Sequence, residues 1–347
     1  MRVLILYTEL AEYVITCLEK LAENAEVHVL RYPVNAEAPF EFSFSSRLNI
    51  YNRKEYDLAG LIQLAQQLQP DIVVCSGWID KDYLKVVKSF RKRIATVMTC
   101  DTQWRGDLRQ NLARIYSRFF LLPLFTHAWV PGKSQQTYVK KLGFKKIQLG
   151  FYSCDLQKFN AGFSSELIAQ RVKAKRFLFV GRYYDFKGIE DLWSAFIQFN
   201  EQQGKDWELW CLGTGSITPI NHPKIKHFGF VQPKDLAPII EACTVFVLPS
   251  RYEPWAVVVH EYAAAGYPLI VSNKVGAREA FVEHGENGYV FEAGNVVALK
   301  EALQKMAELS DKAVISMSER SHRLAQKISP DTWAQTVIDI HNEYARK

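Results

Sequence analysis

The sequence has few of the side-chain patterns that mark common metal and disulfide sites. Its six cysteines, at positions 17, 75, 100, 154, 211 and 243, form no CxxC pair. Several lie in apolar runs, which suits buried, reduced thiols in a cytoplasmic protein. The second half of the chain has no Asp-x-Asp triplet and no cluster of His and Asp ligands. We therefore expect no disulfide framework, no metal site and no bound cofactor.

Long hydrophobic runs are also missing. No stretch approaches the roughly 20 uninterrupted apolar residues that span a bilayer, and the richest candidate, Phe119–Phe125, is interrupted by Pro123. The apolar run at the N-terminus is too short for a signal peptide, and no small-residue cleavage site follows it. These absences predict a cytoplasmic protein without a membrane span.

Acidic residues are scarce in residues 81–146. This segment holds 15 Lys/Arg and three Asp, a net charge of +12, whereas the whole chain carries +6. One interpretation is a solvated face, with Phe119–Phe125 in the core. The other is a surface that rests on an anionic membrane, at the inner leaflet, because cations beside exposed apolar residues are typical of such proteins. Nucleic acid is not expected as a partner, since no nucleic-acid fold motif accompanies the charge.

Short apolar runs alternate with amphipathic helical patterns from the first residue. In the first half, strands are predicted at Val3–Leu6, Val27–Leu30, Ile72–Cys75, Ile94–Met98 and Ala128–Val130. Helices are predicted at Leu10–Leu21, Leu58–Leu68, Asp82–Phe90 and Ser134–Leu142. The segment Arg31–Arg53 has no clean period and is interpreted as a long loop. Alternation of apolar strands with helices indicates an α/β fold with a parallel sheet covered on both faces.

A second series of the same kind follows the polar stretch Gln157–Lys175. Its strands are predicted at Phe177–Val180, Trp207–Leu212, Ile225–Phe228, Val245–Leu248, Leu269–Val271 and Tyr289–Phe291. Its helices include Ile189–Asn200, Lys234–Ala242 and Val257–Ala265, and a last helix, Pro330–Tyr344, has Ser329 as its cap. We expect two Rossmann-like doubly wound domains, residues 1–155 and 170–328, with the helix in residues 330–347 packed back on the first.

Ligands of open parallel sheets bind beyond the carboxyl ends of the strands, and a loop with two cations stands at such a position. Gly181 and Gly188 permit a tight turn, while Arg182 and Lys187 lie close to the start of a helix. Backbone N–H groups, the positive helix end and fixed cations together suit a diphosphate. The alternative is two solvated cations near an ordinary turn.

Two glutamates follow the strand Val245–Leu248. Pro254 suits a first helical turn, so the N–H groups of Trp255 to Val257 are expected to face a ligand. Glu253 lies just before them, and Glu261 lies deeper in an otherwise apolar helix, where hydroxyl groups of a sugar or ribose would hydrogen-bond it. The alternative is one carboxylate at the helix dipole and one on the surface.

A third loop contains Gly229, Phe230 and Val231. A glycine followed by an aromatic residue lets backbone groups approach the edge of a nucleobase. On its own, this pattern is also that of a simple turn.

At these residues the chain resembles the retaining glycosyltransferases of family 4 (glycosyl transferases group 1), which have the GT-B fold of two Rossmann-like domains facing a cleft. The resemblance rests on the pair Glu253-x7-Glu261 and on four further segments. These segments are Gly150–Phe159, Leu212–Gly215, Glu261–Ser272 and Val275–Val290.

The resemblance implies a role for each matching residue. Arg182 and Lys187, on the loop with Gly181, would bind the donor diphosphate, and Glu253 and Glu261 would bind the transferred sugar and the ribose. The backbone of Trp255, Ala256 and Val257 would lie against sugar and phosphate, and Phe230 and Val231 would flank the base. No metal is needed in such enzymes, because cations and the helix end replace it.

The chain departs from its relatives in three places. Tyr7-Thr8-Glu9-Leu10 replaces a glycine pair, Trp255-Ala256 replaces the commoner Phe-Gly, and Thr99-Cys100-Asp101 stands where many have histidine. Asp101 is the candidate acceptor-side catalytic residue, although it could instead cap the next helix or pair with Arg105. His127 is interpreted as a buried, hydrogen-bonded histidine.

The function expected from these residues is a retaining, metal-independent transfer of a sugar from a nucleotide-diphosphate sugar to a glycan or lipid-linked acceptor, as in polysaccharide biosynthesis. Two alternatives stay open. A nucleotide-sugar epimerase of the same fold would need several acids and histidines in one cleft, and only Asp101 is convincing. A non-catalytic sugar-nucleotide-binding protein would not need the full set of Arg182, Lys187, Glu253 and Glu261.

Overall fold

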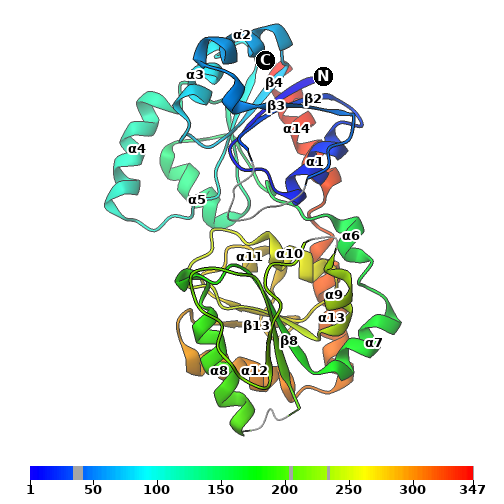
Figure 1. Cartoon of the computed structure of the whole chain (residues 1–347). Helices are drawn as coiled ribbons and strands as arrows, with labels where there is room; N and C mark the ends of the chain where they lie inside the picture. The colour runs from blue at the N-terminus through cyan, green and yellow to red at the C-terminus, as the bar shows by residue number, and fades with distance from the viewer. Residues whose placement is uncertain (34–41, 203–205, 233–234, 347) are drawn as a thin grey trace. The chain divides into compact units, whose positions relative to one another are not determined.

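The computed structural model describes residues 1–33, 42–202, 206–232 and 235–346. The chain forms two compact units, Met1–Asp155 with Ile328–Lys347 and Leu156–Lys327 (Figure 1). Each unit contains one sheet in which all named strand pairs are parallel, and helices alternate with the strands. The predicted fold class, α/β with two doubly wound domains, is confirmed.

The first unit contains a seven-stranded sheet in the order β3-β2-β1-β4-β5-β6-β7. The strands are β1 (Arg2–Tyr7), β2 (Glu26–Arg31), β3 (Leu48–Asn52), β4 (Ile72–Ser76), β5 (Ala95–Thr99), β6 (His127–Trp129) and β7 (Ile147–Gln148). The helices are α1 (Glu12–Leu21), α2 (Leu58–Leu68), α3 (Lys81–Ser89), α4 (Leu108–Phe120), α5 (Lys133–Leu142) and α14 (Pro330–Ala345).

Side chains of β1 show why its run is apolar throughout. Val3 and Ile5 belong to the core beneath α1 and α14, whereas Leu4 and Leu6 belong to the core beneath α2, α3 and α5. Successive side chains of a strand point to opposite faces, so a strand buried on both sides needs apolar residues at every position.

The C-terminal helix α14 packs against α1 in the first unit (Figure 1). Its cap is Ser329, whose side chain accepts a hydrogen bond from the backbone N–H of Thr332 at 3.0 Å. The indole of Trp333 is 3% exposed, lies 4.8 Å from the ring of Trp129, and donates from Nε1 to the carbonyl of Phe151 at 2.7 Å. The helix thus completes the core of a unit whose other elements all lie between Met1 and Asp155.

The second unit contains a six-stranded sheet in the order β10-β9-β8-β11-β12-β13. The strands are β8 (Arg176–Val180), β9 (Glu208–Leu212), β10 (Ile225–His227), β11 (Val245–Leu248), β12 (Leu269–Ser272) and β13 (Gly288–Phe291). The helices are α6 (Leu156–Asn160), α7 (Ser165–Ala174), α8 (Ile189–Gln202), α9 (Ala237–Ala242), α10 (Val257–Ala264), α11 (Arg278–Phe281), α12 (Val296–Ala307) and α13 (Asp311–Ala325).

One segment differs from the sequence-based prediction, and a second contains helices for which no prediction was made. Arg31–Arg53 is not one long loop, because its end forms the edge strand β3; residues 34–41 lie outside the described part of the chain. The polar stretch Gln157–Lys175 is mostly helical, in α6 and α7. Arg171 of α7 is buried, and its guanidinium donates to the carbonyls of Ala265 and Gly266 at 2.9 and 3.1 Å. A charged side chain therefore occupies an interior position of α7, where an apolar residue would have shown the helical periodicity.

The remaining differences are smaller. The helix predicted at Lys234–Ala242 begins at Ala237, and Lys234 itself lies outside the described residues. The helix α4 was not predicted. The six cysteines are buried and free, as expected. Within the described residues, no helix is long and apolar enough to cross a membrane.

Replacing Trp333 by alanine is expected to lower the free energy of unfolding by about 3–5 kcal/mol, because a buried indole and its hydrogen bond are lost together. Gln335→Ala, on the exposed side of the same helix, is the matched control and should change stability by less than about 0.5 kcal/mol. Urea denaturation followed by circular dichroism measures both. A loss below about 1 kcal/mol for Trp333→Ala would show that α14 does not complete this core.

Candidate active site

Three loops at the carboxyl edge of the second sheet are tied together by backbone contacts. The N–H of Gly213, after β9, donates to the carbonyl of Gly229, after β10, at 2.7 Å. The N–H of Tyr183, after β8, donates to the carbonyl of Thr214 at 2.9 Å. A Cβ atom on Gly213 would lie 1.9 Å from the carbonyl oxygen of Gly181, so only glycine permits this approach. Gly181 and the Gly229–Val231 loop therefore lie on one connected edge.

The loop that carries Lys187 is held against the loop that carries Glu253. Gly188 has a φ of +66°, and a Cβ there would lie 2.5 Å from the carbonyl oxygen of Pro249. The N–H of Arg251 donates to the carbonyl of Phe186 at 2.8 Å. The Arg251 guanidinium also donates to both carboxylate oxygens of Asp191, at 2.9 and 2.8 Å, and this pairing raises the pKa of Arg251. The two loops are fixed by sterics and by a bidentate ion pair.

Lys187 and Glu253 form an ion pair, in which Lys187 Nζ donates to Glu253 Oε2. The two side chains are 14% and 13% exposed, so both charges are largely removed from water. The hydroxyl of Ser250 lies 3.3 Å from the same carboxylate oxygen and donates to it. Charges this far buried are costly unless paired. The structure thus places one cation and one carboxylate side by side at the edge where a ligand of this fold binds.

The backbone around Glu253 is held on its other side by the loop after β12. The N–H of Glu253 donates to the carbonyl of Lys274 at 3.2 Å, and the N–H of Gly276 donates back to the carbonyl of Glu253 at 3.1 Å. The N–H of Ala277 donates to the carbonyl of Trp255 at 2.8 Å, and the Trp255 side chain is 2% exposed. The Glu253–Ala256 segment is therefore rigidly positioned before α10 begins.

Helix α10 begins without a side-chain cap among the described residues. Its N-cap residue, Ala256, has φ +81° and ψ +83°, in the left-handed region that favours glycine. The first helical residue, Val257, has its side chain in the core at 9% exposure. Backbone N–H groups at such an end carry a partial positive charge and suit an anionic ligand.

The other predicted donor residues lie on the same unit. Arg182 is exposed, and its guanidinium lies over the ring of Tyr184 at 5.3 Å. Phe230 is 38% exposed and Val231 is partly exposed. Glu261 is partly exposed on α10. Lys187 and Glu253 pair directly. Arg182 lies on the loop after β8, Phe230 and Val231 lie on the loop after β10, and Glu261 lies in α10.

Several positioning residues were not found from the sequence. Ser250, Arg251 and Asp191 hold the Lys187 and Glu253 loops, but Asp191 lies 60 positions from Arg251 and only the folded chain brings them together. Ser272 donates from Oγ to the carbonyl of Ser250 at 2.5 Å. The one available signal was that Ser250 and Ser272 each stand at the end of an apolar strand.

In the first unit, Asp101 follows β5 and accepts a hydrogen bond from Tyr152 Oη at 3.1 Å. Burial raises the pKa of Tyr152, so its hydroxyl stays protonated as a donor. The cap of α4 is Asp107, which accepts from the N–H of Gln110 at 2.8 Å, so Asp101 does not cap that helix. His127 is fully buried, with Nδ1 2.8 Å from Thr126 Oγ1, as predicted.

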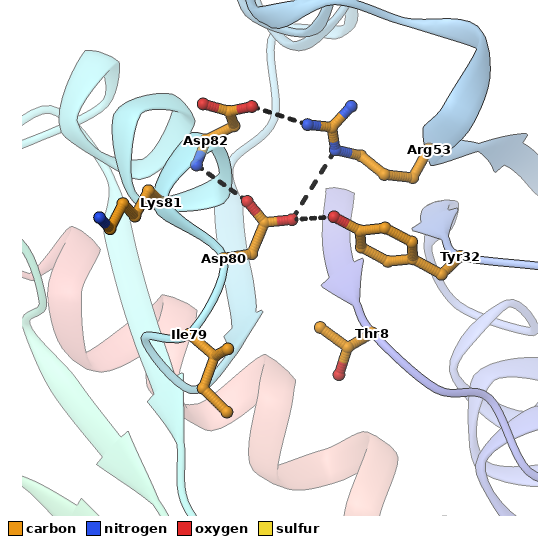
Figure 2. Close-up of a pocket in the computed structure, with 7 residues that line it drawn as sticks. All are labelled: Thr8, Tyr32, Arg53, Ile79, Asp80, Lys81 and Asp82. Atoms are coloured by element: carbon orange, nitrogen blue, oxygen red, sulfur yellow. Dashed lines mark hydrogen bonds and ion pairs between the residues drawn. The ribbon is translucent and has the colours of Figure 1, made fainter.

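A pocket of about 560 Å³ opens at the carboxyl ends of the first four strands of this unit (Figure 2). Its lining residues are Thr8, Tyr32, Arg53, Ile79, Asp80, Lys81 and Asp82. Tyr32 Oη donates to Asp80 Oδ2 at 2.7 Å, which raises the pKa of Tyr32. Arg53 donates to Asp82 Oδ2 at 2.8 Å, and its Nε lies 3.7 Å from Asp80 Oδ2. This cluster was missed because Arg53 stands at the end of the segment interpreted as a loop.

Over the described ranges, no group of three or more His, Cys, Asp or Glu side chains is arranged to hold a metal ion.

Part of the second unit matches a known family model. Residues 174–308 match the family model of glycosyl transferases group 1. An uncharacterized glycosyltransferase of Methanocaldococcus jannaschii is 34% identical over 124 residues, which are 33% of this chain and 31% of that protein. The chain spans less than half the length of the three uncharacterized glycosyltransferases that it matches among curated proteins. These matches support a glycosyltransferase of the group 1 type.

Solved structures agree over the whole chain. Sucrose-phosphate synthase of Thermosynechococcus elongatus superposes with a TM-score of 0.73 at 18% identity, covering all of both chains. The Anabaena protein HepE, in complex with UDP, superposes with a TM-score of 0.73 at 16% identity, covering 99% of this chain and all of that one. At such identities the likeness concerns the fold, which is the two-domain α/β fold of GT-B proteins.

Ala256→Gly is expected to raise the free energy of unfolding by about 1 kcal/mol, because the strain of a left-handed alanine exceeds the added entropy of the unfolded chain. Ala169→Gly, at an exposed position inside α7, is the control and should lower stability by about 1 kcal/mol. Chemical denaturation measures both. A loss of stability in Ala256→Gly would mean that the turn before α10 is not strained.

Proposed function

We propose that the chain is a retaining, hexosyltransferase-type enzyme that moves a sugar from a nucleotide-diphosphate sugar to a glycan or lipid-linked acceptor without a metal ion. The observation that carries the proposal is the Lys187–Glu253 pair, which lies within the part of the chain that matches the family model. The UDP in the complex of the similarly folded HepE supports a nucleotide as the ligand of this edge.

The proposed role of Lys187 follows from its surroundings. Its side chain is 14% exposed, so its charge is poorly screened by water. A diphosphate bound at this edge would attract the ammonium group, and Arg182 and the uncapped start of α10 would add further positive charge. Together these groups stabilise the negative charge that develops on the leaving diphosphate, which is the part a metal ion plays in other enzymes.

The proposed role of Glu253 is to bind the transferred sugar. A carboxylate beside the start of α10 accepts hydrogen bonds from sugar hydroxyl groups. In the described structure this carboxylate accepts from Lys187 and from Ser250. When the diphosphate competes for Lys187, Glu253 can exchange that partner for a sugar hydroxyl. Glu261 then takes the ribose hydroxyls, and Phe230 and Val231 take the base.

The acceptor side belongs to the first unit in this proposal. Asp101 is the candidate acceptor-side base, positioned by its hydrogen bond from Tyr152. The pocket beside Asp80 and Arg53 offers carboxylate, phenol and guanidinium groups at the carboxyl edge of the same sheet. Such a mixed set binds hydroxyl groups of a polyol well.

Glu253→Ala is expected to lower kcat/KM for transfer by roughly 100-fold or more, because a hydrogen bond to the reacting sugar is lost. The affinity for nucleotide diphosphate should stay within about threefold. Lys187→Ala should weaken both. Glu283→Ala, which removes a surface carboxylate paired with Arg320 at 2.7 Å, is the control. Steady-state kinetics and calorimetric titration of the nucleotide diphosphate provide the data. Transfer within a factor of two of the parent in Glu253→Ala would refute the role of this residue.

Excess EDTA is expected to leave the transfer rate unchanged, because the proposed positive charges are all supplied by the protein. The rate is compared before and after chelation, with a titration of Mg²⁺ and Mn²⁺ back into the chelated enzyme as the control. Complete loss that either metal restores would contradict the metal-independent mechanism.

A further inference from the structure

The helix α4 exposes its apolar side chains and buries its polar ones. Its two buried residues are Gln110 and Ser117. Gln110 donates from Nε2 to the carbonyl of Gln103 at 2.7 Å, and its Oε1 accepts from the N–H of Arg105 at 2.7 Å. The face that packs on the unit is therefore small and polar, the reverse of an ordinary surface helix.

The outer face carries a continuous apolar stripe. Its members, with their exposed fractions, are Leu108 (77%), Leu112 (59%), Ile115 (60%), Tyr116 (42%), Phe119 (69%) and Phe120 (56%). The rings of Tyr116 and Phe120 stack at 4.6 Å. At 100° per residue these positions cover one side of the helix. In Figure 1, α4 lies at the outer margin of the first unit, with α5 on its inner side.

The sequence-based candidate for an apolar surface, Phe119–Phe125, is only partly correct. Phe119 and Phe120 are exposed, but Leu121 and Phe125 are 0% and 5% exposed and belong to the core. The exposed surface extends instead toward the N-terminus, along the whole of α4.

Two arginines lie near the edges of the stripe. At 100° per residue, Arg109 lies just inside one edge and Arg118 lies about 60° beyond the other, whereas Arg114 points to the opposite side of the helix. All three are exposed, and α4 contains no acidic residue. Residues 81–146 as a whole carry a net +12. The surface thus offers apolar side chains and positive charge at the same place.

We propose that α4 docks on the surface of an anionic phospholipid bilayer, with its apolar stripe among the acyl chains and its arginines at the headgroups. A bilayer presents an apolar interior directly beneath anionic groups, which is the pattern that this helix complements. Thirteen residues make a helix of about 20 Å, too short to cross the hydrocarbon core and suited to lying in the interface.

A second copy of the chain fits the surface less well. A symmetric contact of two α4 stripes would bring arginine borders against arginine borders, since the same patch faces itself across a two-fold axis. The repulsion between these like charges would grow as the contact excludes water, and it would oppose the apolar association. The bilayer brings opposite charge to the same borders.

The test is vesicle flotation of the full chain without sugar donor, so its outcome does not depend on the proposed transfer reaction. The chain should float with vesicles of phosphatidylcholine mixed with phosphatidylglycerol, and not with phosphatidylcholine alone. Binding should weaken as salt is raised, because the arginines contribute through Coulomb attraction. Failure to bind the mixed vesicles at low salt would overturn the proposal.

Two variants identify the surface. Ile115→Glu with Phe119→Glu should abolish flotation, and Arg109→Ala with Arg118→Ala should weaken it about thirtyfold, since each basic side chain near the surface contributes about 1 kcal/mol. Val297→Glu and Arg323→Ala, at exposed positions of the second unit, are the controls and should bind as the parent does. Thermal melting confirms folding of each variant.

Two results with the variant would contradict the assignment to α4, and a third comes from hydrogen exchange of the parent. One is full binding of the Ile115→Glu/Phe119→Glu variant. The other is a dimer of the parent, seen by analytical ultracentrifugation, that this variant dissociates, since the stripe would then be an interface between copies. Faster or unchanged hydrogen exchange in residues 108–120 on addition of mixed vesicles would also overturn the proposal, because docking should slow exchange there.

Discussion

The candidate site of the second unit depends on the contact between Gly188 and the carbonyl of Pro249. Gly188 has no Cβ atom, and therefore the turn after β8 can lie directly against the turn after β11. That approach brings Lys187 to Glu253, two residues that the chain separates by 66 positions. The bidentate pair of Arg251 with Asp191 then holds the turns in register. A charged pair with little water around it follows from the packing of two backbones.

The buried strands and the candidate residues that follow them could be predicted from the sequence. Strands such as β8 and β11 are buried on both faces, so their runs are apolar throughout and easily recognised. The residues Arg182, Lys187, Glu253 and Glu261 were located because they follow such strands and resemble a known pattern. That Lys187 and Glu253 touch was not predictable, since spacing along a chain does not report contact across a sheet edge.

Three elements, β3, α7 and α4, could not be predicted from the sequence. The edge strand β3 is only half buried, so its residues do not form an apolar run, and the pocket that includes Arg53 was lost with it. In α7 the buried Arg171 makes an interior position look exposed. The helix α4 has apolar residues at helical spacing, but a pattern of this kind does not say which face is turned to the core, and here the polar face is.

The proposed reaction is sugar transfer from a nucleotide sugar. The most direct test is to incubate the chain with a panel of nucleotide-diphosphate sugars and candidate acceptors, and to follow the nucleotide diphosphate and the sugar by chromatography and NMR. A glycosyltransferase of this kind should release the nucleotide diphosphate while it transfers, or slowly hydrolyses, the sugar with retention of its anomeric configuration. Epimerised donor without release of the diphosphate would contradict it, as would binding of the donor with no turnover.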